Sequence, residues 1–346
     1  MSTIKVNSIK NTSTDDGGIA IDNSGHVQID GQQLPTSGQL SNRNLIINGA
    51  HIVWQRQTSV SGGSALDSFA YATDRFWLYA PSSTSGTVGQ STDAPSGFIY
   101  STHNNLDSSC SIGTNVELLK QGSDAPFVNG ESLTFSFYIK STSTRTGVAL
   151  TITTRDNSGG AGSVTRATGV TFNSTTSWTR VEKTFTLSGT VSSNNRCFQI
   201  EFSLAAGDKV TGFQLEKGDK ATPFEHRSYG DELARCQRYC FKYAPSNQEW
   251  IYNEGNVASG KWWHFYYPPM RDTPSFDAGT LSTGSGTSVV GLTGTISSLS
   301  AGGSFGSGAS GRQSIRVTMS SSGGTAYNIH HTDAWAGDHC FCFSEL

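Results

Sequence analysis

The sequence predicts an all-β protein, and three observations lead to that prediction. Gly is frequent, at 39 of 346 residues, Ser and Thr dominate the polar residues, and only 15% of residues are charged. Gly, Ser and Thr are weak helix formers, whereas Thr and aromatic residues suit strands. Several segments also alternate apolar and polar residues, as half-buried strands do. With 18 Phe, 11 Tyr and 7 Trp available for packed cores, we expect folded β-domains rather than disorder.

Residues 1–43 are predicted to form an N-terminal β stem that anchors the protein, with residues 32–42 as a linker. The segment contains no aromatic residue, and residues 18–31 predict two short strands around an Asn-Ser-Gly turn. A single hairpin buries little surface and is marginal alone. Intertwining with copies from other subunits would cover its apolar side chains, so we expect a homotrimer. A flexible tail is the alternative.

Residues 44–228 are predicted to form one β-sandwich or jelly roll. Between residues 132 and 139 the sequence alternates almost perfectly, which places Leu133, Phe135 and Phe137 on one face of a strand. Further runs of this kind are separated by Gly-rich or Ser-rich turns, as in sandwiches and jelly rolls. The expected strands are 45–47, 75–79, 133–139, 148–153, 180–187, 197–204 and 210–216.

Residues 229–242 are predicted to form one linking helix. Asp231 and Glu232 stand near its start, where negative charge complements the helix dipole. Its buried side is expected to carry Leu233, Cys236, Tyr239 and Cys240.

Residues 243–346 are predicted to return to strands as a C-terminal β-sandwich. The stretch 261–267 is the strongest strand candidate, and 314–319 and 339–343 are others. Residues 279–311 are rich in Gly and Ser and are expected to be loop.

Several motifs together resemble a module that is common in phage tail fibres. They are NLIING (44–49), WQR (54–56), DRFW (74–77), LTFSFYIK (133–140), FQLEKG (213–218), ATPFEHR (221–227) and ELARCQRY (232–239). That module is similar to the jelly rolls of carbohydrate-binding modules. The final residues 343–346 resemble the close of many fibre C-terminal domains, and the N-terminal segment resembles short fibre stems of phages, including cyanophages.

The resemblance implies a phage virion fibre subunit that attaches the particle to host cell-surface glycan. Its expected partners are two further copies of itself, other virion proteins at the N-terminal segment, and host surface polysaccharide. The expected location is the surface of the virion, after synthesis in the host cytoplasm. A structural role as a head fibre, decoration protein or tail connector is the alternative, and a glycan depolymerase is a third reading.

An aromatic cluster between residues 250 and 267 is the strongest candidate for ligand contact. On a strand, Trp262 and Tyr266 share one face, and Trp263 and Tyr267 share the other. One face should be core; the other could stack on sugar rings or pack against a neighbouring subunit. Burial is the commoner role for aromatic residues. The candidate glycan-contact residues are Trp250, Tyr252, Trp262, Trp263, Tyr266 and Tyr267.

Other aromatic and potential metal-binding residues are expected to be structural. Trp54, Trp77 and Trp178 lie in or beside strand-like stretches and are expected in the core. His330 and His331, with the acidic and Cys residues at 333–342, have residue types that zinc accepts but no established ligand spacing, so no metal is predicted. The six scattered Cys residues are expected to be free thiols.

The charge and motif content disfavour several function classes. A net charge of −3 without a basic stripe argues against nucleic acid as a partner. No run approaches the ~20 apolar residues of a membrane helix, and the N-terminus lacks the apolar core of a signal peptide. No pair of carboxylates, nucleophile motif or phosphate loop stands out, so we expect a binding protein without enzymatic activity or cofactor.

Overall fold

The computed structural model describes most of residues 42–243 and separate strands on either side. Outside 42–243 it describes 8–10, 18–21, 27–29, 32–33, 252–257, 260–266, 268, 270, 275–277, 295–301, 314–320 and 340–343. Inside that range residues 68, 120–121, 124 and 156–162 are not described. The described residues form a nearly all-β structure with one α-helix and one short 3-10 helix, η1 (Gly63–Ala65). None of these helices has the length and apolar run needed to cross a bilayer.

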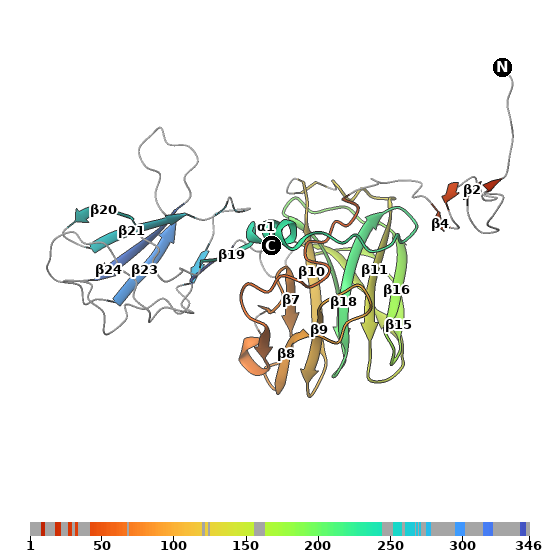
Figure 1. The fold of residues 1–346 in the computed structure, drawn as a ribbon, viewed down its shortest axis with the longest axis horizontal. Coiled ribbons are helices and arrows are strands. Elements are labelled where there is room, and N and C mark those ends of the chain that lie inside the picture. The colour runs from red at the N-terminus through yellow and green to blue at the C-terminus, as the bar shows by residue number, and fades with distance from the viewer. Residues whose placement is uncertain are drawn as a thin grey trace, which may run out of the picture.

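Two six-stranded antiparallel sheets form a β-sandwich (Figure 1). Sheet I has the order β14 (Val164–Ala167), β13 (Thr151–Arg155), β17 (Cys197–Leu204), β10 (Cys110–Glu117), β7 (Phe76–Tyr79), β6 (Ala70–Tyr71). Sheet II has the order β16 (Thr179–Thr186), β11 (Ser132–Lys140), β18 (Lys209–Lys217), β9 (Ser101–Leu106), β8 (Gly86–Ser91), β5 (Ser59–Ser61). Strands β12 (Arg145–Ala149) and β15 (Thr171–Ser174) form a separate pair.

The core between the sheets is built around phenylalanine rings. Phe137 of β11 stacks on Phe202 of β17 and on Phe213 of β18, with centroid separations of 4.8 Å and 5.6 Å. The predicted alternation in β11 is confirmed, because Leu133, Phe135, Phe137 and Ile139 are all fully buried. Each such side chain contributes roughly 1.5–3 kcal/mol by leaving water, so this cluster stabilises the sandwich strongly.

Five of the predicted strands of the sandwich are confirmed to within one residue, and two predictions need correction. The stretch 45–47 is not a strand, because Asn44 caps the backbone N–H of Ile46 and residues 47–50 form a turn. The stretch 148–153 is not one strand either. It divides at Leu150 between β12 and β13, which belong to different sheets.

Helix α1 (Tyr229–Gln237) is shorter than the predicted 229–242. Ser228 caps its start by accepting a hydrogen bond from the backbone N–H of Asp231 at 3.2 Å. The prediction was wrong beyond residue 237, because Cys240–Tyr243 form strand β19, which pairs with β25 (Cys340–Phe343). Cys236, Tyr239 and Cys240 are buried as predicted, whereas Leu233 is half-buried.

The predicted N-terminal hairpin is confirmed. Strands β2 (Gly18–Ile21) and β3 (Val27–Ile29) pair in antiparallel register, with Ile19 opposite Ile29. Strands β1 (Ser8–Lys10) and β4 (Gln32–Gln33) extend them to a four-stranded sheet. Ile19 and Ile21 remain 44% and 46% exposed. The stem role and the trimer stay predictions.

The predicted C-terminal strands are found where they were expected. Strands β20 (Tyr252–Val257), β21 (Gly260–Tyr266), β24 (Ser314–Ser320) and β23 (Thr295–Ala301) form one sheet. Strand β22 (Ser275–Asp277) pairs with β25 beside β19. The expectation that all of 279–311 is loop is wrong at β23, where backbone pairing with β24 outweighs the Ser-rich composition. The rest of that range lies outside the described residues.

Candidate functional site

The outer face of sheet I carries a grid of aromatic and polar side chains. In β17 the residues Phe198, Ile200 and Phe202 point into the core, so strand alternation places Gln199 and Glu201 on the outer face. The strand register then fixes which neighbours stand beside them. We call the two rows built on these residues the upper row, through Glu201, and the lower row, through Gln199.

The upper row runs from aromatic to acidic residues across five strands. Its members, in order, are Tyr71, Trp77, Gly113, Glu201 and Thr151. The Trp77 ring lies across Gly113: a Cβ added there would stand 2.1 Å from the ring atom Cζ2. Only glycine leaves room for the indole at this position. Trp77 itself is 4% exposed.

Two further rings extend the aromatic half of this face. Phe69 stacks on Tyr79 with centroids 5.2 Å apart and meets the edge of Trp77 at 5.3 Å. Phe69 is 50% exposed, although aromatic residues of this size are usually buried. The Arg56 guanidinium lies 4.4 Å from the centre of the Tyr71 ring. A flat, partly solvent-facing aromatic surface therefore covers β6 and β7.

The lower row provides hydrogen-bonding groups. It consists of Asn115, Gln199 and Thr153. The Gln199 amide donates to Glu201 Oε2 at 2.6 Å and accepts from Arg155 Nη1 at 3.4 Å. Thr153 Oγ1 and Arg155 Nε are buried without a hydrogen-bond partner in the described part of the chain. Buried polar atoms usually have partners, so these two unsatisfied atoms are exceptions within the sheet.

The Glu201 carboxyl is held in a partly desolvated position. Burial raises its pKa above the usual range, while the charge of Arg155 and the hydrogen bond from Gln199 act in the opposite direction. A carboxylate that has lost part of its water shell, next to a planar amide and a guanidinium, is well placed to accept hydroxyl donors.

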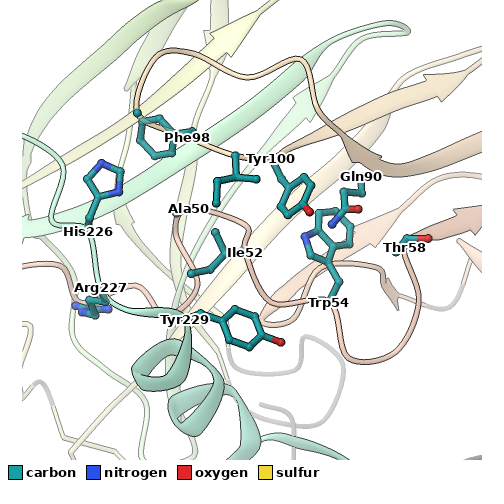
Figure 2. A pocket seen from close by; sticks show the side chains of 12 residues that line it. Ala50, Ile52, Trp54, Thr58, Gln90, Phe98, Tyr100, His226, Arg227 and Tyr229 are labelled. Carbon is teal, nitrogen blue, oxygen red and sulfur yellow. The ribbon is translucent and has the colours of Figure 1, made fainter.

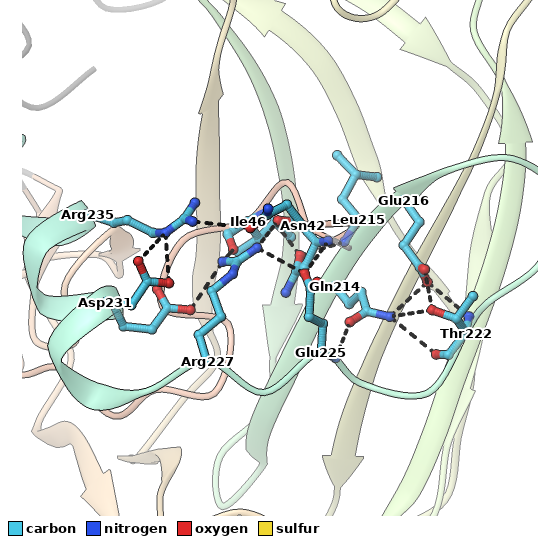
Figure 3. Close-up of polar contacts among 12 residues, drawn as sticks. Asn42, Ile46, Gln214, Leu215, Glu216, Thr222, Glu225, Arg227, Asp231 and Arg235 are labelled. Carbon is cyan, nitrogen blue, oxygen red and sulfur yellow. Dashed lines mark hydrogen bonds and ion pairs between the residues drawn. The ribbon is translucent and has the colours of Figure 1, made fainter. Parts of the chain in front are cut away.

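The outer face of sheet II is different, because the chain itself covers strand β18 (Figure 3). Gln214 and Glu216 point outward from β18, yet both are buried beneath the segment 219–228, which we call the exit segment. Thr222 donates its backbone N–H to Glu216 Oε2 at 3.0 Å, and Glu225 donates its backbone N–H to Gln214 Oε1 at 2.8 Å. The polar groups of this part of sheet II are thus satisfied internally.

Arg227 ties the exit segment to residues at the start of the sandwich (Figure 3). Its guanidinium donates to the carbonyl oxygens of Asn44 and Ile46 and pairs with Glu225 and Glu232, each at 3.2 Å. Burial alone would raise the pKa of Glu225, but the Asn44 N–H and the Arg227 charge lower it overall. The motifs at 44–49, 221–227 and 232–239 therefore meet in space as a structural clamp.

Residues 68–204 match the family model described as a carbohydrate binding domain. No curated protein matches the sequence. The matched range includes all of β6, β7, β10, β13 and β17. These strands carry every residue of both rows, including Tyr71 in β6.

Several solved structures are distantly similar to this chain. The CBM22-1 xylan-binding domain of Paenibacillus barcinonensis Xyn10C is 9% identical, with 54% of this chain and 100% of that chain covered and a TM-score of 0.31. A putative sugar-binding protein of Bacteroides thetaiotaomicron is 14% identical, with 51% and 100% covered and a TM-score of 0.33. Tailspike protein 4 of bacteriophage CBA120 is 17% identical, with 46% and 21% covered and a TM-score of 0.29. These similarities are too distant to assign a ligand or partner to this protein.

The glycan-contact residues predicted from the sequence lie outside the matched range 68–204. Tyr252 is in β20, and Trp262, Trp263 and Tyr266 are in β21, which confirms the predicted strand. Trp250 and Tyr267 lie outside the described residues. Whether any of the six contacts glycan stays a prediction.

The three tryptophans expected in the core of the domain differ from one another. Trp77 is buried as predicted, but its ring lies on the outer face of sheet I. Trp54 is half-buried and packs against the core cluster, so the prediction is confirmed in part. Trp178 is half-buried and is not part of the core cluster, so for it the prediction was wrong. The described residues contain no group of three or more His, Cys, Asp or Glu side chains suited to a metal; the stretch 330–339 lies outside them.

Sequence reasoning missed both rows of sheet I. Their members come from five strands and are separated by up to about 130 positions in the chain, and among them only Trp77 belongs to one of the resemblance motifs, DRFW (74–77). A usable signal was present in β17, where Gln199 and Glu201 alternate with Phe198, Ile200 and Phe202. Large polar residues in such a pattern mark the outer face of a sheet.

Proposed function

We propose that this protein binds neutral polysaccharide on the outer face of sheet I and does not cleave it. The observation that carries the proposal is that one face of sheet I has aromatic rings at one side, Phe69 and Tyr79, and hydrogen-bonding groups around Gln199 at the other. These residues lie within the range that matches the carbohydrate binding domain model. Sugar rings have apolar C–H faces that stack on aromatic rings. Their hydroxyls are both donors and acceptors, and amide, carboxylate and guanidinium groups satisfy both roles.

The charges of the two rows support binding without cleavage. Glycoside hydrolysis generally needs two carboxyl groups on either side of the scissile bond. Glu201 is the one carboxylate in the two rows, and it is paired with the Gln199 amide rather than poised beside a second acid. A single desolvated carboxylate suits the recognition of a hydroxyl group.

Affinity gel electrophoresis of the full chain in gels that contain neutral polysaccharides tests this proposal. We expect retardation by at least one neutral polysaccharide, and loss of most of it in Tyr79→Ala and in Gln199→Ala. Val128→Ala is a control, because Val128 is an exposed apolar residue (53%) that lies outside the two rows. Unchanged retardation of both Tyr79→Ala and Gln199→Ala would place the binding surface elsewhere.

We also propose that the domain serves as the glycan-binding part of a phage virion fibre subunit. Support comes from the motif resemblance and from the N-terminal sheet, whose exposed Ile19 and Ile21 need covering surface of the kind that an intertwined trimer provides. Light scattering of the full chain should give three times the chain mass of 36.9 kDa. A monomer would contradict the trimer.

The position on a particle distinguishes adhesion from a structural role. Immunogold labelling of intact virions with antibodies against residues 243–346 should mark the tail or its fibres. Label on the head would instead favour a decoration role, and absence of label from every particle would contradict the virion assignment. Release of new reducing ends from host polysaccharide would replace the binding proposal with a depolymerase.

A further inference from the structure

The fold contains a pocket of about 610 Å³. Figure 2 shows the side chains that line it. Its walls come from three segments: residues 50–58, Gln90 with 97–100, and residues 226–229. No residue of either row lines it. Its volume falls within the roughly 300–1,000 Å³ of typical small-ligand pockets. Ile99 and Tyr229 on its lining are 65% and 57% exposed, so the pocket is open to solvent.

The first wall is fixed by the indole of Trp54. Trp54 Nε1 donates to the backbone carbonyl of His51 at 2.6 Å, and one part of the ring packs against the core. The ring therefore has a set orientation while remaining half-buried at the pocket. Figure 2 shows Trp54 and Tyr100 at one end of the pocket with Gln90, and Phe98 and His226 towards the other.

The second wall, residues 97–100, is anchored by Asp93. Its carboxylate accepts hydrogen bonds from Lys209 at 2.7 Å, from Lys140 at 3.0 Å and from Trp178 Nε1 at 3.0 Å. These bonds hold the pKa of Asp93 well below its usual range. Ser101 also donates its hydroxyl to the Asp93 carbonyl at 2.6 Å. Both strands β11 and β18 thus hold this loop in place.

The third wall is held by Arg227, whose charge is already neutralised. Its guanidinium pairs with Glu225 and Glu232 and donates to two backbone carbonyls. The other polar groups of the pocket are uncharged or weakly basic: the Gln90 amide, the Thr58, Tyr100 and Tyr229 hydroxyls, and the His226 ring. An anionic ligand would find no free cation among these residues, and a purely apolar ligand would leave the amide and hydroxyls unpaired.

We infer that this pocket is a second carbohydrate site, which takes the end of a neutral oligosaccharide. Trp54, Tyr100 and Tyr229 supply ring surfaces for stacking on sugar C–H faces, and Gln90 and Thr58 supply hydrogen bonds for the hydroxyls. The three separately anchored walls pre-organise the pocket, so little ordering is needed on binding. Two sites on one domain would let a single chain hold a polysaccharide at two points.

Fluorine NMR of the full chain labelled with 5-fluorotryptophan tests the inference. The Trp54 and Trp77 signals are assigned from Trp54→Phe and Trp77→Phe. We titrate neutral hexaoses, cellohexaose and xylohexaose, and expect the Trp54 signal to shift saturably. The shift should persist in Tyr79→Ala, which alters only the sheet I face. Tyr100→Ala and the exposed Tyr229→Ala should each weaken it about fivefold to tenfold, as expected for loss of one ring contact.

The outcomes separate this inference from the proposed function. A shift of Trp77 alone, abolished in Tyr79→Ala, would support binding on sheet I and overturn the second site. A shift of Trp54 alone would support the pocket and contradict the sheet I site. If neither signal moves with either hexaose, or if Tyr100→Ala and Tyr229→Ala leave the Trp54 titration unchanged, the pocket is not a site for neutral sugars.

Discussion

Gly113 offers a direct way to perturb the proposed sugar-binding face of sheet I. It lies in β10 opposite Trp77 of β7, and the indole crosses the strand where a side chain would otherwise stand. A methyl group at residue 113 would lie 2.1 Å, 2.4 Å and 2.9 Å from three ring atoms of Trp77. Ordinary contacts between such carbons begin near 3.5 Å, so Gly113→Ala must displace the ring by more than 1 Å.

The expected loss of stability follows from this displacement. Trp77 is almost fully buried, and inserting a methyl group into a well-packed region costs about 1–3 kcal/mol. We therefore expect urea denaturation of Gly113→Ala to give a free energy of unfolding lower by about 1–3 kcal/mol. Because the ring also moves out of the upper row, retardation by neutral polysaccharide should fall as well.

Gly230→Ala is the matched control for this experiment. A Cβ at residue 230 meets no atom within 4 Å, and the residue lies in the first turn of α1. Replacing a helical Gly by Ala is expected to raise stability by up to about 1 kcal/mol. If Gly113→Ala unfolds within about 0.5 kcal/mol of the wild type, the size of an ordinary surface change, the Trp77 ring does not lie across β10. The double variant Gly113→Ala/Trp77→Leu should lose less stability than the two single variants together.

Three further predictions concern buried charge. Burial lowers the pKa of His51 to about 3, so below pH ~6.5 only the unfolded chain takes up this proton. The free energy of unfolding should then fall by about 2 kcal/mol from pH 7 to pH 5, and His51→Asn should show a correspondingly shallower pH dependence. Burial raises the pKa of Glu201, so the ionised carboxylate destabilises the folded state, and this loss of stability develops as pH rises to the folded pKa. Glu201→Gln should therefore require more urea to unfold than the wild type at pH 7 but not at pH 4. Arg227→Met leaves the buried Glu232 without its cation and should lower the free energy of unfolding by about 3–5 kcal/mol. Arg235→Met breaks an exposed pair with Asp231 and should lower it by less than about 0.5 kcal/mol. Equal losses of unfolding free energy in these two variants would contradict the structural clamp at Arg227.

The strands could be predicted where one face is apolar and the other polar. Strands β11 and β17 have this pattern, and their bounds follow from it almost residue by residue. Helix α1 was predicted to run too far, because nothing local in Cys240–Tyr243 opposes a helix. Only pairing with Cys340–Phe343, about a hundred residues later, makes that stretch a strand. Such long-range pairing overrides local preference.

The candidate site could not be predicted from local pattern, because it depends on strand register. Gly113 is one glycine among 39, and it becomes informative only once β7 lies beside β10. Trp54 illustrates the same limit: apolar neighbours suggested core, yet its hydrogen bond to the His51 carbonyl fixes the ring at the edge of the pocket. Three of the resemblance motifs (44–49, 221–227 and 232–239), by contrast, meet at the Arg227 clamp, which joins the start of the sandwich to the exit segment.

A crystal structure of the full chain with bound neutral hexaose tests the central claim most directly. The account predicts sugar rings across β7, β10 and β17, one of them stacked on Phe69 or Tyr79 and a hydroxyl within hydrogen-bond distance of Gln199 or Glu201. Sugar bound in the pocket beside Trp54 would be the second site and would not replace the first. A hexaose that binds tightly in solution but leaves both rows of sheet I untouched would contradict the account.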